Sequence, residues 1–544
     1  MSGLLLVLAL GAIAVMAFGH RIGLQPGLAI LVAAAGVSFI PGLPRWELEP
    51  ELILGVVVPP LLYAAALEFS FFSFMRNLRS IIGLGVGLVV ATAFLAGHAA
   101  AWVLPGLGVS VALVLGAIVG PPDTVTIASH GRELGLTRRV NALLTGESLV
   151  NDAAALTMFS VFVAGVAGTE TFIDGPVQLF LYSVVVGVLI GMVLGFAATF
   201  VRPRLHEPTL ETAIGLVLPF AAFFVAEHVH ASGVLAVVMA GFSVSMNSVY
   251  SDGGFEGHRQ EDLDDERYRK RLERRHRIAR RLDYRTRLTE GAIWPVVNTL
   301  LEAFVFAYTG LQLRFVIEEL VDSDEPLGRT LLAGTVILLV VIGIRVAYIM
   351  FLFRPSPRRE ARRARSRELR RKRRVERLMR AGQLRRAEQA DQVESRPNRP
   401  LGWSEAFLLS WAGMRGIVTL GAAGGIPFAL DDGTPFPHRS TIQFLAYFVV
   451  IGTLVVQGPT LPLFARWLRI DTTEEDAIAG SELAAARALA DEKAPGGYDA
   501  QRDAVTMAVV NRVFDDEAAR LVLADVDQQE AAAVSRARST KPAE

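Results

Sequence analysis

The sequence predicts an all-α, polytopic membrane protein with about 13 transmembrane helices. Apolar residues fall in blocks of about 17–27, the length that crosses roughly 30 Å of hydrocarbon at about 1.5 Å per residue. The links between the blocks alternate between basic ones and ones that are short or acidic. Two blocks, near 108–130 and 403–430, are interrupted by glycine and proline. These observations exclude a soluble multidomain protein, which would place polar surfaces between its apolar cores.

The candidate spans are residues 3–19, 25–41, 51–67, 80–103, 108–130, 139–167, 176–200, 210–228, 230–247, 290–313, 327–353, 403–430 and 441–468. No basic region precedes the first block, so we expect a retained span and not a cleaved signal peptide. The chain contains no cysteine, which excludes disulfides and thiolate metal sites. We therefore expect a transmembrane domain over 1–468 and a tail over 469–544.

The basic links predict the orientation in the membrane. They are His20–Arg21, Arg76 with Arg79, Arg132 with Arg138 and Arg139, Arg202 with Arg204, and the loops 250–290 and 354–402. The positive-inside rule places these links in the cytoplasm of a plasma-membrane protein, with the amino terminus outside and the carboxyl terminus inside.

The loop 354–402 is the most basic segment, because residues 354–399 hold 18 Lys or Arg against 6 Asp or Glu. Such a segment is expected to bind anionic lipid headgroups. No aromatic residues are interleaved with its arginines, which argues against nucleic acid as a partner. The tail is rich in Ala, Glu and Asp and is predicted to be helical, with regulation and dimerisation both open as its role.

The sixth span carries four polar residues in "TGESLVNDAA". Glu147 and Asn151 are four residues apart, as are Ser148 and Asp152, so a helix places all four on one stripe. A carboxylate at mid-bilayer costs about 2.5–3.5 kcal/mol on insertion scales. Two of them require partners, protons or a bound ion, and the simpler alternative is that they only lock helices together.

The fifth span contains "GAIVGPPDTVTIAS", in which Pro121 and Pro122 remove backbone donors and disfavour helix before them. A break here leaves backbone groups that a cation and its carboxylate can satisfy. Asp123 follows the break, where its charge would offset the positive end of the second half-helix. The alternative is a plain proline kink with Asp123 as its N-cap.

The twelfth span, "AGMRGIVTLGAAGGIP", is also weakened by glycines and carries the cation Arg415. The two irregular spans are seven apart, so they run in opposite senses, as in the inverted repeats of secondary transporters. A buried guanidinium requires a partner, and Glu147 is the expected one.

These motifs resemble the bacterial sodium/proton antiporters of the monovalent cation/proton antiporter family, which are related to eukaryotic sodium/hydrogen exchangers. The resemblance covers about residues 1–468 and rests on "GESLVND", the preceding Asp-bearing broken span and "GMRG". It implies that Asp152 carries the cation or proton, that Asn151 and Asp123 lie at the centre of two crossing helices, and that Ser148 coordinates the ion. It also implies a structural Glu147–Arg415 ion pair and a homodimer with a moving core and a static dimer domain.

Two positions depart from the family pattern. Many relatives read Thr-Asp-Pro in the fifth span where this chain reads Pro122-Asp123-Thr124, so the ligands around the break, Thr124 among them, can be arranged differently. Relatives often place an acid directly after the "PPLLY"-like stretch, where this chain has Ala64. The nearest acid is Glu68, for which a place in the cytoplasmic funnel and a place among headgroups are equally compatible with the sequence.

The sequence therefore predicts an antiporter, not an enzyme, that needs no cofactor. Alkali ions prefer oxygen ligands, which Asp152, Asp123 and Ser148 supply for Na⁺ or Li⁺. Two carboxylates in low dielectric resist double ionisation, so H⁺ and the metal ion compete for one group. Position 151 is Asn and every Lys lies outside the spans, which predicts one proton per cation, electroneutral exchange and a role in pH homeostasis.

Two more intramembrane residues have open roles. Glu302, near the expected boundary between the two domains, is predicted to pack or to hydrogen-bond, and Arg345 to pair with Glu302 or to extend to the cytoplasmic surface. The alternatives for the whole protein are a K⁺/H⁺ antiporter on the same scaffold, a cation channel, and a non-transporting scaffold or sensor. The sequence contains no filter motif, which argues against a channel. A non-transporting scaffold would have no need for Asp152 beside a broken span.

Overall fold

The structure is a computed structural model. Apart from a few isolated positions, it describes residues 26–41, 52–69, 71–123, 135–168, 175–205, 207–252, 284–321, 326–354, 401–430, 433–470, 472–510 and 516–539. Nearly all elements in these ranges are helices, and pairing of the β type is confined to the two single-residue bridges Asp123–Met414 and Ala429–Pro435. The predicted all-α class is therefore confirmed.

Seven helices in the described ranges are long and apolar enough to cross a membrane, and four shorter apolar helices accompany them. The first candidate span, most of the loop 250–290 and nearly all of the loop 354–402 lie outside the described residues. The count of 13 spans, and lipid binding by the loop 354–402, therefore stay predictions.

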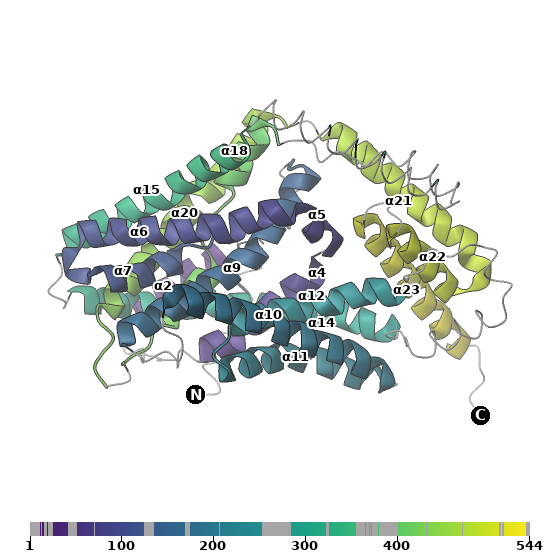
Figure 1. The fold of residues 1–544 in the computed structure, drawn as a ribbon, viewed down its shortest axis with the longest axis horizontal. Helices are drawn as coiled ribbons and strands as arrows, with labels where there is room; N and C mark the ends of the chain where they lie inside the picture. Colours follow the sequence, from purple (N-terminus) through teal and green to yellow (C-terminus); the bar gives the residue numbers. More distant parts are fainter. Residues whose placement is uncertain are drawn as a thin grey trace.

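The membrane helices form two groups that meet along one boundary. The core bundle contains α5 (Phe71–Ile82), α6 (Val89–Val103), α7 (Val109–Val119), α9 (Arg138–Ala167), α15 (Leu327–Leu352), α18 (Trp403–Trp411), α19 (Ile417–Gly424) and α20 (Arg439–Leu468). The scaffold bundle contains α2 (Pro26–Ser38), α4 (Val58–Glu68), α10 (Pro176–Val201), α11 (Pro208–His228), α12 (Gly233–Asp252) and α14 (Tyr284–Val321). Figure 1 shows α6, α15 and α20 on one side, α10, α11 and α14 on the other, and α9 between them.

Helix burial follows this arrangement. On α10, the side chains of Leu181, Leu189 and Val193 are more than half exposed, as expected for a helix that faces lipid. On α9, the side chains of Glu147, Ser148, Asn151 and Asp152 are all buried. The polar stripe therefore faces protein on the central helix, which agrees with its prediction from the four-residue spacing.

Close packing of α6 against α7 depends on small residues. A methyl group at Gly116 would lie only 2.0 Å from the carbonyl oxygen of Ala93, so the two helices could not approach as they do with any other residue there. This contact holds α7, which leads into the first break, firmly against the core bundle.

Both predicted breaks have a counterpart in the structure. Helix α7 ends at Val119, and residues 120–123 that follow it are not helical. The second half of that span lies outside the described residues. The twelfth span is interrupted between α18 and α19, as its glycines predict.

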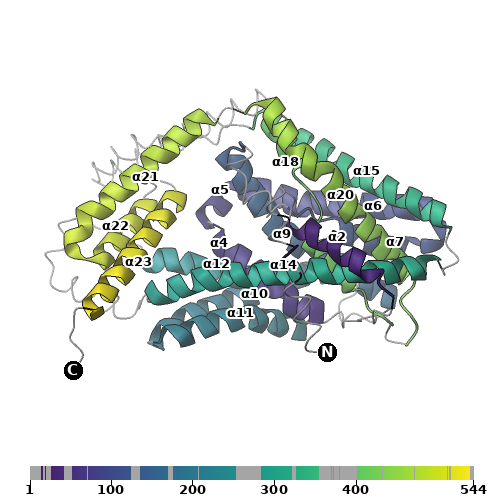
Figure 2. The ribbon, with the colours of Figure 1, turned by 180° about the vertical axis from the view of Figure 1, so that it is seen from behind.

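The tail forms α21 (Thr473–Lys493), α22 (Tyr498–Val510) and α23 (Asp516–Ser539), in agreement with its predicted helicity. These helices pack around their own apolar cluster, which includes Ala486, Val505 and Val522. Figures 1 and 2 show the three helices together at one end of the molecule, and α22 and α23 contact α12 and α14 respectively.

Candidate functional site

The centre of the site is the point where the two breaks meet. The backbone N–H of Asp123 donates to the carbonyl oxygen of Met414 at 2.6 Å, and the two residues form an antiparallel bridge. The segments therefore run in opposite senses, as an inverted repeat requires. The crossing of two broken spans is confirmed where the structure describes it.

The Asp123 carboxylate contacts the other broken span, whereas the half-helix that it was predicted to cap in its own span lies outside the described residues. Its Oδ2 atom accepts the backbone N–H of Ile417, the first residue of α19, at 3.4 Å. The negative charge thus lies at the positive end of α19, in the other broken span. Gly416 permits this contact, because a Cβ atom there would lie 2.0 Å from Asp123 Oδ2.

Asn151 ties α9 to the crossing. Its Nδ2 atom donates to the carbonyl oxygen of Pro122 at 2.8 Å. That carbonyl belongs to the non-helical stretch after α7, so the amide satisfies one of the backbone groups that the break leaves. The contact fixes the stripe of α9 beside Asp123.

Buried oxygen atoms on this stripe lack partners. The Ser148 Oγ and Asn151 Oδ1 atoms have no hydrogen-bond partner among the residues that the structure describes. Asp152, four residues after Ser148, is only 7% exposed. Unsatisfied buried oxygens cost about 1–3 kcal/mol each, so their retention beside a carboxylate fits a site that a cation fills. The three side chains supply the oxygen donors that alkali ions require.

The Glu147–Arg415 pair was predicted wrongly, because the structure pairs Glu147 with Arg345. The two Arg345 Nη atoms contact the two Glu147 carboxylate oxygens, with Nη2 3.1 Å from Oε2. Arg345 also donates to the carbonyl oxygens of Ser410, at 3.0 Å, and Leu409, at 3.1 Å. These contacts also correct the prediction that Arg345 pairs with Glu302 or extends to the surface.

Arg415 instead binds backbone carbonyls at both breaks. Its Nε, Nη1 and Nη2 atoms donate to the oxygens of Val119, Gly413 and Gly120 at 3.1, 2.7 and 3.4 Å respectively. Val119 and Gly120 lie at the end of α7, where free carbonyls carry partial negative charge. The guanidinium is therefore satisfied by dipoles of the broken helices, and its positive charge stays close to Asp123.

Glu302 faces this centre from the scaffold bundle. With Asp123, Arg415 and Gly416 it lines a cavity of about 30 Å³, whose remaining lining residues are Pro26, Gly27, Leu28, Phe306, Met414 and Leu454. The cavity lies on the boundary between the bundles, since Glu302 belongs to α14 and Asp123 to the crossing. The position of Glu302 at the boundary agrees with its prediction. Its contact with the same cavity as Asp123 was not predicted.

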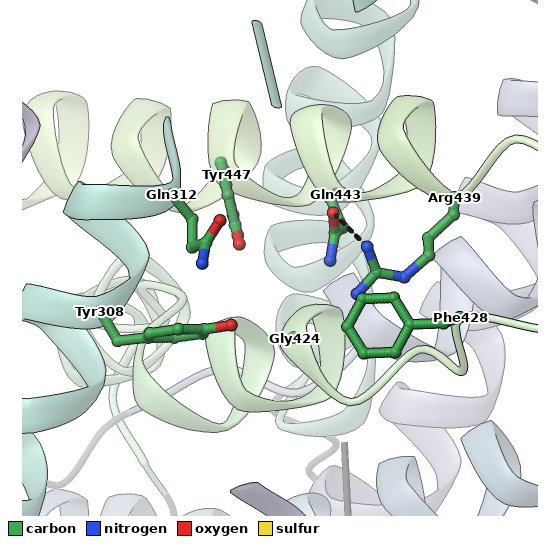
Figure 3. A pocket seen from close by; sticks show the side chains of 7 residues that line it. All are labelled: Tyr308, Gln312, Gly424, Phe428, Arg439, Gln443 and Tyr447. Atoms are coloured by element: carbon green, nitrogen blue, oxygen red, sulfur yellow. Dashed lines mark hydrogen bonds between the residues drawn. The ribbon is translucent and has the colours of Figure 1, made fainter. Parts of the chain in front are cut away.

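A second, smaller polar cavity lies on the same boundary (Figure 3). It has about 10 Å³ and is lined by Tyr308 and Gln312 of α14 and by Gly424, Phe428, Arg439, Gln443 and Tyr447 of the core bundle. Arg439 lies over the Phe428 ring at 4.2 Å and donates to Gln443 Oε1 at 3.4 Å. Polar side chains therefore continue along the boundary beyond the crossing.

Two predicted ligands are not described, and two polar groups were missed. Thr124 lies outside the described residues, and the structure describes no side chain for Glu68, the last residue of α4. Thr419 on α19 and Gln457 on α20 were not predicted, yet both are buried with side-chain atoms that have no partner among the described residues. The available signal for Gln457 was a polar side chain within a predicted apolar span.

Comparisons with known proteins agree with this geometry. The model of the sodium/hydrogen exchanger transmembrane family matches residues 5–259 and 274–467. An uncharacterized Na⁺/H⁺ exchanger of Mycobacterium tuberculosis (strain H37Rv) is 28% identical over 492 residues, which cover 89% of this chain and 78% of the relative. A sodium, potassium, lithium and rubidium/H⁺ antiporter of Bacillus subtilis is 26% identical over 451 residues, which cover 81% of this chain but only 57% of the relative.

A solved structure shows the same fold. The sodium proton antiporter MjNhaP1 of Methanocaldococcus jannaschii aligns with a TM-score of 0.57 and 14% sequence identity, over 86% of this chain and 98% of that chain. The family match includes every membrane helix that builds the crossing. The family consists of transporters and not of enzymes. The chain therefore belongs to the sodium/hydrogen exchanger family of multi-pass monovalent cation/proton antiporters.

Proposed function

We propose that this chain exchanges Na⁺, or Li⁺, for H⁺ across the plasma membrane, with Asp152 as the carrier of both species. The observation that carries the proposal is the burial of Asp152 on the same stripe as two oxygens, Ser148 Oγ and Asn151 Oδ1, that have no partner within the described part of the chain. A metal ion bound there gains oxygen ligands. A proton on Asp152 removes the charge that attracts the ion, so the two species exclude each other.

Coupling follows from the cost of moving charge through the boundary between the bundles. An ionised, empty Asp152 would have to pass the apolar contacts between α9 and the scaffold helices α10 and α12. Loading with H⁺ or Na⁺ neutralises it. Alternating access therefore requires a load in each direction, and no ATP is consumed.

The charges support electroneutral 1:1 exchange. Glu147 is neutralised by Arg345 within the core bundle, so it has no free charge to exchange. Glu302 lies on α14 of the scaffold bundle and does not travel with α9, so a proton bound to it is not carried across. Asp152 is then the group whose proton is transported.

The positions of the basic residues support the proposed orientation. Arg138, at the start of α9, and Arg287, near the start of α14, both contact the tail, so these two ends and the tail lie on one face. Both arginines belong to links that the positive-inside rule places in the cytoplasm. We therefore propose that the tail lies in the cytoplasm and the amino terminus outside. Homodimerisation is proposed from the family resemblance alone.

The test is dissipation of an imposed pH gradient in proteoliposomes by Na⁺, Li⁺ and K⁺. Asp152→Asn should abolish exchange, because the amide takes up no proton and has no negative charge to attract the metal ion, while the chain folds as before. Glu227→Gln is the matched control. It likewise replaces a carboxylate with an amide, on α11, where the side chain accepts the Gly233 N–H, and it should keep wild-type exchange. Exchange at wild-type speed by Asp152→Asn contradicts the proposal.

The same assay decides ion selectivity and stoichiometry. The Bacillus subtilis relative is named for sodium, potassium, lithium and rubidium. Exchange driven by K⁺ and not by Na⁺ would replace the proposed substrate with the K⁺ alternative. A membrane-potential dye should stay silent during turnover, and a steady potential generated by exchange would overturn the 1:1 ratio.

A further inference from the structure

The tail continues the chain from α20 of the core bundle, and among the described residues it also contacts this bundle at Arg138, the first residue of α9. The backbone N–H of Arg138 donates to Glu475 Oε2 at 2.9 Å. Its guanidinium lies 3.6 Å from a Glu482 carboxylate oxygen and 3.6 Å from a Glu517 carboxylate oxygen. Carboxylates at a helix N-terminus are favourable because they oppose its positive end. Three tail acids thus hold the end of the helix that carries Asp152.

The tail contacts the scaffold bundle at different residues. Arg287 of α14 donates through Nε and Nη2 to the two carboxylate oxygens of Asp527, each at 2.7 Å. Arg520 of α23 donates to the carbonyl oxygen of Phe69, which follows α4, at 3.3 Å. Packing of α22 on α12 and of α23 on α14 adds to these contacts. The attachment to the scaffold bundle is therefore broader and its ion pair shorter.

A stiff connection joins the two attachments. Asp527, which holds Arg287, also accepts from Arg502 Nε at 2.9 Å inside the tail. Burial alone would lower the pKa of Arg502, but hydrogen bonds and ion pairs with Glu530 and Asp527 raise it above its ordinary value. Arg502 thus stays charged and links α22 to α23. Together with the apolar cluster of the tail, this network makes the three helices one unit.

We propose that α21–α23 form an intramolecular strap that ties the ion-carrying α9 to the scaffold bundle and slows the displacement of one bundle against the other. The inference rests on the proposed alternating access. The two attachments differ in strength. The Arg138 contact is ionic, its guanidinium is 3.6 Å from its partners, and the side chain is 29% exposed, so it is the one that opens when the bundles move.

Two variants break the Arg138 contact from opposite sides. Arg138→Gln removes the cation, and the double variant Glu482→Gln with Glu517→Gln removes two of its partners. Each should raise turnover about two- to fivefold, as loss of a partly exposed ion pair predicts. Combining all three changes should give no further increase. The control Arg487→Gln breaks an exposed pair with Asp525 inside the tail, 3.3 Å long, and should leave turnover unchanged.

A cross-link tests the reverse effect. The chain contains no native cysteine, so Arg138→Cys with Glu482→Cys can be joined by a short bis-methanethiosulfonate without side reactions at other sites. The joined protein should exchange more slowly than the unjoined one, and a reducing agent should restore its speed. Unchanged or lower turnover in Arg138→Gln, or full speed in the joined protein, overturns the strap.

Hydrogen exchange separates failure of the strap from failure of the proposed function. In Arg138→Gln the amides in the first turn of α9 should lose protection, whereas those of α23 near Arg287 should keep it. Loss of protection in a protein that shows no Na⁺/H⁺ exchange would reject the proposed transport and retain the tie between the tail and α9. Unchanged protection would reject the strap whatever the transport assay shows.

Discussion

Removing either member of the Glu147–Arg345 pair should destabilise the protein strongly. Both side chains are at most 1% exposed, and Arg345 contacts both carboxylate oxygens of Glu147 and two backbone carbonyls. Breaking a buried pair from one side costs about 3–5 kcal/mol, because the remaining charge has no partner. Arg345→Met leaves the Glu147 carboxylate buried and uncompensated, so it should reach this range. Glu147→Gln should cost less, since Arg345 keeps the carbonyls of Leu409 and Ser410.

A double-mutant cycle measures the pair directly. The double variant Glu147→Gln with Arg345→Met removes both charges of the pair, so it should be more stable than Arg345→Met alone and give a coupling of up to about 3 kcal/mol. Unfolding free energies from denaturant titration in detergent provide the measurement. The matched cycle pairs Glu147→Gln with Arg415→Met and should show much smaller coupling. Additive effects for Glu147 and Arg345, or stronger coupling between Glu147 and Arg415, would refute the assignment.

Two further substitutions test the site itself. Gly416→Ala places a Cβ atom 2.0 Å from Asp123 Oδ2 and must displace this carboxylate. We therefore expect at least a tenfold loss of Na⁺-driven exchange. The control Gly343→Ala should have no effect, because a Cβ atom there meets nothing within 4 Å. Glu302→Gln removes a negative charge from the cavity that Asp123 lines. The Na⁺ concentration for half-maximal exchange should therefore rise about three- to tenfold, which corresponds to roughly 1 kcal/mol. The 1:1 ratio of Na⁺ to H⁺ should stay unchanged. An unaltered Na⁺ dependence would remove Glu302 from the cation path.

Patterns local to one helix allowed correct predictions from the sequence. The four-residue spacing of Glu147, Ser148, Asn151 and Asp152 depends only on helix periodicity, and the structure buries all four on α9. The breaks after α7 and between α18 and α19 follow from proline and glycine, which act on their own backbone. The sense in which the two breaks meet followed from counting spans.

Contacts between helices were harder to predict. Arg415 was expected to pair with Glu147, whereas Arg345 was expected to pair with Glu302 or to extend to the cytoplasmic surface. Arg345 pairs with Glu147 because α15 packs against α18 within the core bundle. There the Arg345 side chain lies between the Leu409 and Ser410 carbonyls and the Glu147 carboxylate. Arg415 needed no carboxylate, since three free carbonyls of the broken helices satisfy it. The sequence cannot show that backbone carbonyl oxygens, and not a carboxylate, will balance the charge of a buried arginine.

The amino-acid sequence alone determined that this chain crosses a membrane repeatedly, breaks two of its helices and carries a polar stripe with two carboxylates on another. These features arise from hydrophobic length, backbone chemistry and helix periodicity, each of which acts within about 20 neighbouring residues. Only the tertiary structure decided which charges meet, which oxygens stay unpartnered, and that the tail reaches α9 and α14 together. Those outcomes depend on the packing of helices distant in sequence, and a contact between side chains exists only when two such surfaces come within a few ångströms.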